Sequence, residues 1–355
     1  MQRNFILTDV MKTGDHRMYE KFIGLHSLEN QSFDCDGEYY TLHRHDLDTY
    51  DRKIAFIDLR IHNDRLIGNQ QYEDDLQKRL ELLHQQGFVF ILACPWESQE
   101  NLKTQNFMAN KIMPKLNIPY PHITWSGGVS WFWFYMYDKH KDTKFNFSHD
   151  PANKIHDFLY LNKGSRPHRV KLYENLLSKG ILENSIHTFI ERVPPRRLDK
   201  KYELPGINPE DYPRWGKDQD IYELPYNNTA CSLVSETNDV DYEIFMTEKI
   251  WKPIIAQHTF VVHGNYLYLQ KLREMGFKTF SSYFNEDYDI EKNPDVRIDK
   301  IVNTCRDLLS KNWQDIYLQT KALRQHNYNH FFNEEKLSLE INKTINLFLE
   351  FADSR

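Results

Sequence analysis

Three short segments of the chain combine carboxylates with lysines and arginines in a pattern that suits one kind of chemistry. Their sequences are CPWESQEN at 94–101, NKGSRPHR at 162–169 and SETNDVDYEIFMTEK at 235–249. A helix amino terminus with Lys and Arg nearby favours binding of a diphosphate, and carboxylates there suit paired sugar or ribose hydroxyls. A further carboxylate facing such a site suits a general base. Together the segments predict group transfer from a nucleotide-activated donor.

The charges at the end of the third segment are the reason for expecting an anion. Within FMTEKIWKPIIAQHTFVVHG, residues 245–264, Thr247 and Glu248 suit the positive end of a helix. Lys249 and Lys252 follow at once, and cations are unfavourable at that end. We therefore expect the diphosphate to lie beside Lys249.

Each segment follows a predicted strand, so the segments are expected at the carboxyl ends of the strands, facing the same side. Buried strands are predicted at 53–59, 88–94, 122–125, 156–161, 185–190, 231–235, 259–264 and 277–280. Helices are predicted at 72–87, 101–116 and 169–180, from Thr247 onward, and at 266–276 and 337–351. The apolar run WFWFYMY at 131–137 is expected to be a buried strand or part of an aromatic pocket wall.

The alternation of strands and helices begins twice, which predicts two α/β domains. The polar stretch 138–154 is interpreted as the linker between a domain at 1–150 and a second at 151–335. Residues 336–355 are expected to form a helix that packs back on the first domain. Open parallel sheets bind ligands at the carboxyl ends of their strands, so a cleft between the two domains is expected to hold the site.

Composition and charge exclude several classes of protein. With 355 residues, 40% of them hydrophobic, the chain is long enough to bury two cores. The net charge of −6 argues against nonspecific nucleic-acid binding. Four widely spaced cysteines without a CxxC pair indicate reduced thiols, and the polar start of the chain lacks the apolar core of a signal peptide. A cytoplasmic location is expected.

Several standard enzyme motifs are absent from the sequence. We find no GxGxxG, GxxxxGK[ST], HExxH or GxSxG, which disfavours dinucleotide oxidoreductases, P-loop enzymes, zincins and serine hydrolases. The cluster HRHDLD offers His43, His45, Asp46 and Asp48 as metal ligands, so a metal-dependent hydrolase stays open as an alternative. A noncatalytic carbohydrate-binding protein is a third reading.

The three segments resemble the signatures of the family 10 α1,3/4-fucosyltransferases. ETN from Glu236 and FMTEK from Phe245 stand where that family has E-N-S and Y-x-T-E-K. Asn162 and Arg169 keep the seven-residue separation of its S-N-x5-A-R-V-x-x-Y stretch. ESQEN from Glu97 is similar to its E-S-P-x-N, with Gln in place of Pro. The three matches occur in the family's order.

The resemblance covers roughly residues 88–280, and two departures from it fall beside the expected donor. Phe245 replaces the tyrosine of Y-x-T-E-K, and Thr237 replaces the asparagine of E-N-S. Both changes weaken the inference that the sugar is fucose, so another nucleotide sugar remains an alternative.

The resemblance implies an inverting glycosyltransferase of the GT-B type, with two Rossmann-like domains facing across a cleft. The first domain would bind the acceptor and the second the nucleotide sugar, GDP-fucose. Glu97 would be the base. From their position beside Arg169, Arg166 and His168 are expected to be minor helpers in contacting the phosphate. The donor would be bound by Asn162, Arg169, Glu236, Thr247, Glu248 and Lys249.

In this scheme Arg169 and Lys249 stabilise the leaving diphosphate, so no metal or other cofactor is expected. The expected partners are a nucleotide sugar and an oligosaccharide or glycan acceptor. Association with the membrane periphery is left open, and no nucleic acid is expected.

Overall fold

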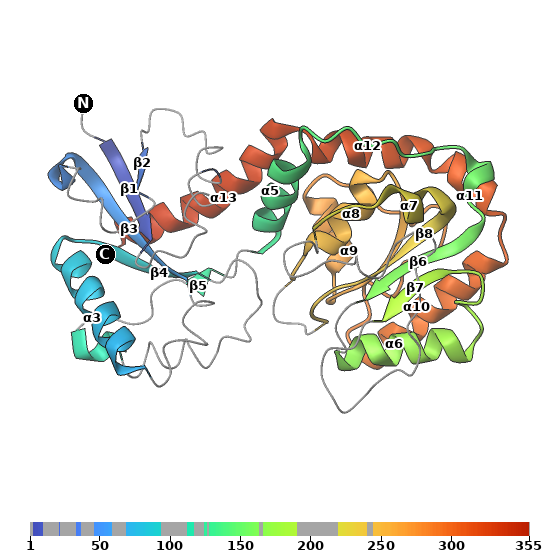
Figure 1. The fold of residues 1–355 in the computed structure, drawn as a ribbon, viewed down its shortest axis with the longest axis horizontal. Coiled ribbons are helices and arrows are strands. Elements are labelled where there is room, and N and C mark those ends of the chain that lie inside the picture. The colour runs from blue at the N-terminus through green and yellow to red at the C-terminus, as the bar shows by residue number, and fades with distance from the viewer. Residues whose placement is uncertain are drawn as a thin grey trace. The chain divides into compact units, whose positions relative to one another are not determined.

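The computed structural model describes residues 3–9, 21, 33–36, 46–58, 69–93, 112–116, 124–125, 128–162, 166–189, 219–239 and 244–354. This part of the chain is mixed α/β with two sheets of parallel strands (Figure 1). The predicted α/β class is therefore confirmed. The chain forms two compact units, which we call the amino-terminal unit, Met1–Tyr135 with Glu334–Arg355, and the central unit, Met136–Asn333.

The amino-terminal unit is built on a parallel sheet with the strand order β2-β1-β3-β4-β5. The strands are β1 Arg3–Asp9, β2 Phe33–Asp36, β3 Tyr50–Asp58, β4 Val89–Ala93 and β5 Thr124–Trp125. Two 3₁₀ turns, η2 Leu47–Thr49 and η5 Met113–Leu116, also lie in this unit.

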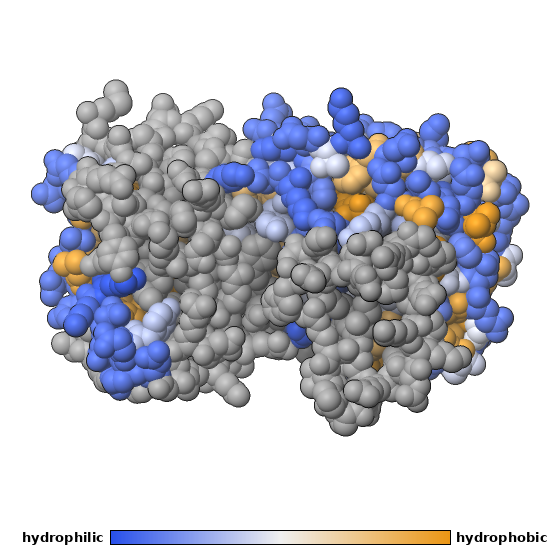
Figure 2. Space-filling model, viewed as in Figure 1, coloured by the Kyte–Doolittle hydropathy of each residue, from blue (hydrophilic) through white to orange (hydrophobic). Residues whose placement is uncertain are grey.

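Helix α3, Gln70–Gln85, covers this sheet with a narrow apolar stripe. Asn69 caps its first turn, and Leu76, Leu80 and Leu83 are buried at helical spacing against strand residues such as Phe90. The outer face of α3 is mainly hydrophilic (Figure 2). The helix ends before Gly87, whose φ of 83° lies in the left-handed region that favours glycine.

Helix α13, Glu334–Asp353, returns to the amino-terminal unit from the far end of the sequence. Phe348 meets Phe56 of β3 edge-on, with ring centroids 5.5 Å apart. The hydroxyl of Thr344 lies 3.1 Å from that of Ser130. The first contact joins the last helix to the sheet, and the second joins it to residue 130.

The central unit contains a parallel sheet with the order β7-β6-β8-β9. Its strands are β6 His156–Asn162, β7 Ile186–Phe189, β8 Thr229–Ser235 and β9 Thr259–His263. Its helices are α6 Pro167–Ser178, α7 Glu223–Asn228, α8 Glu248–Ile255, α9 Tyr268–Glu274, α10 Pro294–Leu309, α11 Trp313–Gln319 and α12 Lys321–Phe331. A short 3₁₀ turn, η6 Pro151–Asn153, precedes β6.

Helices cover both faces of this sheet, as the alternation along β6 requires. Tyr160 packs on Tyr173 of α6, with ring centroids 6.1 Å apart. Its neighbour Leu159 points the other way and packs with Tyr226 of α7 and Ala256 after α8. Helix α10 lies beside α6 and helix α12 beside α8 (Figure 1). Strand β8 is buried at every position, as a central strand of a covered parallel sheet should be.

The segment 131–137 is a helix, so its prediction as a strand was wrong, whereas its predicted burial is confirmed. It lies in α5, Gly128–His140, where Trp131 and Trp133 are fully buried. A helix that is apolar on nearly every side has no polar positions to reveal its period, so the sequence pattern could not separate it from a strand. The division between the two units falls within this helix.

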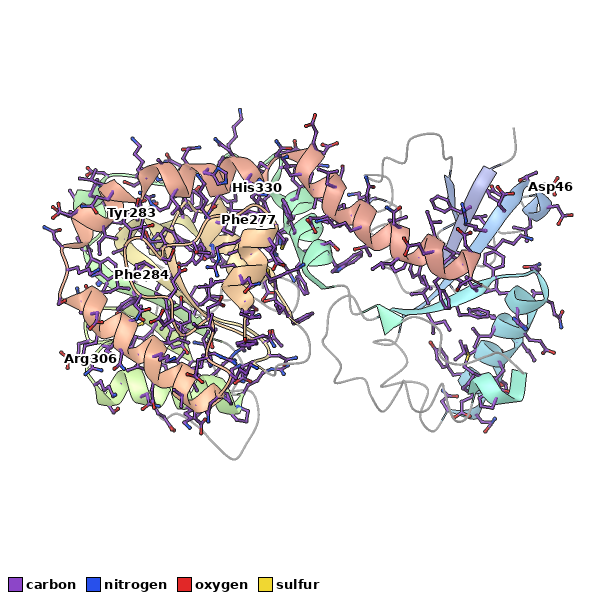
Figure 3. The ribbon with its side chains drawn as sticks, turned by 180° about the vertical axis from the view of Figure 1, so that it is seen from behind. Asp46, Phe277, Tyr283, Phe284, Arg306 and His330 are labelled. Atoms are coloured by element: carbon purple, nitrogen blue, oxygen red, sulfur yellow. The ribbon has the colours of Figure 1, made fainter. Side chains whose placement is uncertain are left out.

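Two further expectations differ from the structure. The stretch 138–154 is not a free linker, because it completes α5 and then packs in the central unit, with Phe145 stacked on Phe147 at 5.0 Å. Residues 277–280 form no strand. Phe277 instead packs edge-on against His330 of α12, with ring centroids 4.5 Å apart. Both residues are labelled in Figure 3. Most of the helix predicted at 101–116 lies outside the described residues.

In the described part of the chain, no helix has both the length and the apolar character that crossing a bilayer requires.

Lys154 is a buried cation near the start of the central sheet. Its ammonium group donates to the carbonyls of Tyr226, at 2.7 Å, and Ser148, at 3.4 Å, and lies 4.7 Å from the ring centroid of Tyr317. The guanidinium of Arg324 lies 3.5 Å from the centroid of the same ring. Burial, reinforced by the Arg324 charge, lowers the pKa of Lys154 to about 7.

Replacing Lys154 with Met should remove a pH dependence of stability. Because the folded pKa is about 7 and the ordinary value is 10.5, the unfolded chain binds more protons between these pH values. The free energy of unfolding of the wild type should therefore rise from pH 7 to pH 10, and that of Lys154→Met should rise less. Urea unfolding at several pH values, with Lys300→Met as a surface control, measures this. Equal slopes for all three proteins would contradict the assignment.

Candidate functional site

The carboxyl edge of the central sheet brings two of the three predicted segments together. Asn162 ends β6 just before α6, and Glu236 follows β8. Arg169, in the first turns of α6, donates from Nε to the backbone carbonyl of Glu236 at 3.0 Å. The second and third segments are therefore in direct contact, as expected for loops at the ends of neighbouring parallel strands.

Two cations from different helices converge on the hydroxyl of Thr237. The Lys249 ammonium lies 3.2 Å from Thr237 Oγ1, and Arg169 Nη2 lies 3.5 Å from the same oxygen. Lys249 comes from the first turn of α8 and Arg169 from α6. Two cations so placed can contact neighbouring oxygens of one diphosphate.

Arg169 carries its charge in a buried position. Its side chain is 4% exposed, and within the described residues no carboxylate forms an ion pair with it. Burial, with the nearby charge of Arg166, lowers the pKa of Arg169 below its ordinary value, yet a guanidinium stays protonated near neutral pH. A buried cation held by a carbonyl and a hydroxyl alone is stabilised further by any anion that reaches it.

Glu236 uses its carboxylate to fasten the start of α8. One oxygen accepts from the backbone N–H of Thr247 at 3.2 Å and from the hydroxyl of Tyr268 at 2.6 Å. The other accepts from the hydroxyl of Thr247 at 2.6 Å. The side chain is fully buried, so in this structure it positions α8, and the predicted contact with sugar or ribose hydroxyls stays a prediction.

The start of α8 already holds negative charge of its own. The hydroxyl of Thr247 accepts from the backbone N–H of Lys249, and Glu248 lies 2.7 Å from the Lys249 ammonium. Burial raises the pKa of Glu248, but the charges of Lys249 and Lys252 outweigh this and leave the pKa below its ordinary value. The ionised Glu248 therefore offsets part of the unfavourable charge of Lys249.

The start of α6 has no such internal compensation. Its N-cap residue is Arg166, which makes no capping hydrogen bond through its side chain, and its first turn contains no acidic residue. Arg166 donates to the side-chain oxygen of Asn238 at 3.2 Å. Of the two helix termini at this edge, α6 is thus the one whose backbone N–H groups and cations are better suited to an external anion.

His168 lies between the two segments, next to Arg169. Its Nε2 is 3.1 Å from the carbonyl of Glu236, and its Nδ1 is 3.5 Å from the carboxylate of Asp239. Burial lowers the pKa of His168, and the Asp239 charge opposes that shift. The ring also meets His263 edge-on at 5.4 Å.

Asn162 is buried at the same edge, and its side-chain amide lacks hydrogen bonds to the described residues. It is 4% exposed, and neither atom of its amide has a hydrogen-bond partner among the described residues. Its backbone N–H donates to the hydroxyl of Thr188 at 3.3 Å. An unpaired buried amide is costly, so the position favours a further polar partner, in keeping with its predicted role.

The structure places only some of the remaining predicted residues, Asp46 and Asp48. Glu97, His43 and His45 lie outside the described residues. Asp46 accepts from the backbone N–H of Asp48 at 3.4 Å. Among the described residues no group of three or more His, Cys, Asp or Glu side chains is arranged to bind a metal ion.

Sequence reasoning missed two residues that support the site. Tyr268 carries the hydroxyl that reaches Glu236, and an added Cβ at Gly264 would lie 2.5 Å from the Tyr268 ring. Gly264, which follows β9 and lies four residues before the start of α9, was visible in the sequence, but its close approach to a ring was not. The second residue, Arg297, donates to the carbonyls of Asp239 and Gly264, and nothing in the sequence pointed to these contacts.

Comparison of the chain with protein-family models, curated proteins and solved structures finds no match.

Replacing Tyr268 with Phe should destabilise the central unit. The change removes one of three donors to a fully buried carboxylate, which should lower the free energy of unfolding by about 1–3 kcal/mol. Tyr283→Phe is the matched control, because the hydroxyl of Tyr283, labelled in Figure 3, donates to the Gln319 carbonyl at an exposed position. Urea unfolding of both variants is the measurement. Equal small losses would show that Glu236 does not depend on Tyr268.

Proposed function

We propose that this protein is a glycosyltransferase that takes its sugar from a nucleoside diphosphate donor bound by the central unit. The observation that carries the proposal is the convergence of Arg169 and Lys249 on Thr237 at the carboxyl edge of the sheet. The two residues come from the segments that also carry the resemblance to family 10 fucosyltransferases.

The charges at this edge suit a diphosphate as leaving group. Arg166, Arg169 and Lys249 supply cations, and the first turn of α6 adds backbone N–H groups and contains no acidic residue of its own. Such groups stabilise negative charge as it develops on the departing diphosphate, which is the main electrostatic demand of glycosyl transfer from an activated donor. The buried position of Arg169 strengthens its interaction with charge.

The finer assignment rests on the resemblance. It favours the GT-B type, GDP-fucose as donor, an oligosaccharide or glycan acceptor, and inversion at the anomeric carbon. In that reaction an acceptor hydroxyl oxygen forms a bond to the anomeric carbon as the bond to the diphosphate oxygen breaks. The electron pair of the broken bond leaves with the diphosphate, and Glu97 takes the hydroxyl proton.

Within this proposal the residues of the central unit divide their roles. Arg169 and Lys249 contact the diphosphate, and Asn162 offers its unpaired amide to the donor. Glu236 acts through Thr247 by fixing the start of α8. Glu248 remains the better candidate for binding a donor hydroxyl, since its side chain is 13% exposed and its pKa is lowered.

Nucleoside diphosphates should stabilise the protein against heat, and the stabilisation should depend on both cations. GDP at 100 times its dissociation constant should add about 2.7 kcal/mol, and guanosine, which lacks phosphate, should add far less. Lys249→Met and Arg169→Lys should each lose most of this effect. Lys271→Met should keep it, because Lys271 is an exposed cation paired with Glu274 on α9.

A thermal-shift panel of GDP, UDP, CDP and guanosine measures these differences. If UDP alone stabilises the protein, the proposed donor changes from a GDP-sugar to a UDP-sugar. No response to any nucleoside diphosphate, or a response that both variants retain in full, would contradict the proposal.

Replacing Glu97 with Gln should separate binding from chemistry. The amide cannot accept the acceptor's proton, so transfer should fall by about 10² or more while GDP binding is kept. Mass spectrometry of products from a panel of nucleotide sugars and glycan acceptors measures transfer. Unchanged turnover in Glu97→Gln would remove Glu97 from the mechanism.

A further inference from the structure

Arg297 is a fully buried arginine that joins three segments of the central unit. It lies in the first turn of α10 and is 1% exposed. Its Nη1 donates to the carbonyls of Asp239, at 3.1 Å, and Gly264, at 3.0 Å. Its Nε and Nη2 donate to the carbonyls of Glu291, at 2.8 Å, and Lys292, at 3.3 Å. One guanidinium thus holds the loop after β8, the end of β9 and the approach to α10.

The carbonyls of Asp239 and Gly264 belong to segments that contact the residues around Arg169 and Lys249. The carboxylate of Asp239 faces His168, which precedes Arg169 in α6. The loop held at Asp239 also contains Thr237, the hydroxyl on which Arg169 and Lys249 converge.

The residues after β9, beginning with Gly264, contact groups that hold the start of α8. Gly264 packs against Tyr268, whose hydroxyl donates to Glu236. The next residue, Asn265, accepts from the backbone N–H of Phe245 at 3.2 Å, two residues before the N-cap Thr247.

We propose that Arg297 is a positioning residue for the donor site: its guanidinium fixes the loop after β8 against the end of β9 and thereby sets where Thr237 and His168 lie. The part that concerns the donor rests on the proposed function. Arg297 touches no ligand in this account and acts through the two loops.

The geometry requires a guanidinium rather than any cation. Arginine has five N–H donors in a planar fork, so one group reaches carbonyls on several segments at once. A lysine at this position has three donors on one nitrogen and cannot span the same set. Arg297→Lys therefore keeps the charge but releases some of the carbonyls, and Asp239 and its side chain are free to move.

The experiment compares Arg297→Lys with Arg306→Lys. Arg306 lies on the same helix and its side chain is exposed (Figure 3). Arg306→Lys therefore makes the same chemical change but leaves the hydrogen bonds of Arg297 intact. Two quantities are measured in each protein. The first is the titration midpoint of the His168 imidazole by NMR, with its signal identified among the 16 histidines through His168→Asn. The second is the dissociation constant for GDP, UDP and CDP by calorimetry.

In Arg297→Lys we expect the His168 midpoint to fall, because the Asp239 charge that favours the protonated ring is displaced. Nucleotide affinity should fall about tenfold or more, since small displacements of binding groups have large effects. Arg306→Lys should change neither quantity. A folded Arg297→Lys with an unchanged His168 midpoint, or with a shifted midpoint and full nucleotide affinity, overturns the proposal.

A second variant covers the case in which Arg297→Lys does not fold. Asp239→Asn leaves the carbonyl bound by Arg297 intact and removes the charge beside His168. It should lower the His168 midpoint but keep nucleotide binding, because Arg297 still holds the loop, and an unchanged His168 midpoint would overturn the proposal. If the wild type binds no nucleoside diphosphate but Arg297→Lys still lowers the His168 midpoint, the proposed function fails while the positioning of the loop by Arg297 stands.

Discussion

A single residue at the end of β8, Glu236, ties together three helices of the central unit. Its backbone carbonyl accepts from Arg169 and His168 of α6, and its carboxylate accepts from Thr247 at the start of α8 and Tyr268 of α9. A carboxylate buried in this way is costly unless donors surround it, so these contacts depend on one another. The placement of the cations follows from this arrangement.

The contrast between α6 and α8 changes how the charge pattern of the sequence is understood. Lys249 at the positive end of α8 suggested an anion at that helix, but Glu248 and Thr247 already occupy its first turn. The terminus without a side-chain cap belongs to α6, whose N-cap residue is Arg166. An anion bound at this edge would be contacted by Lys249 from one side and by the start of α6 from the other.

Much of the fold was predictable because strands and helices of the central unit have clear periods and ends. Arg169, Thr247 and Lys249 were placed correctly at strand-to-helix junctions, since chain order alone fixes which end of a parallel strand they follow. The helical form of 131–137 was not predictable, because a helix buried on all sides lacks the alternation of apolar and polar residues that reveals a helical period. Arg297 and Tyr268 were not predictable either, since their partners are remote backbone carbonyls or a remote carboxylate.

The most direct test of the account is the structure of the protein crystallised with GDP. The account predicts diphosphate oxygens within about 3.5 Å of both the Arg169 guanidinium and the Lys249 ammonium, at the start of α6. A nucleotide bound on another surface, with Arg169 and Lys249 unchanged and out of its reach, would contradict it.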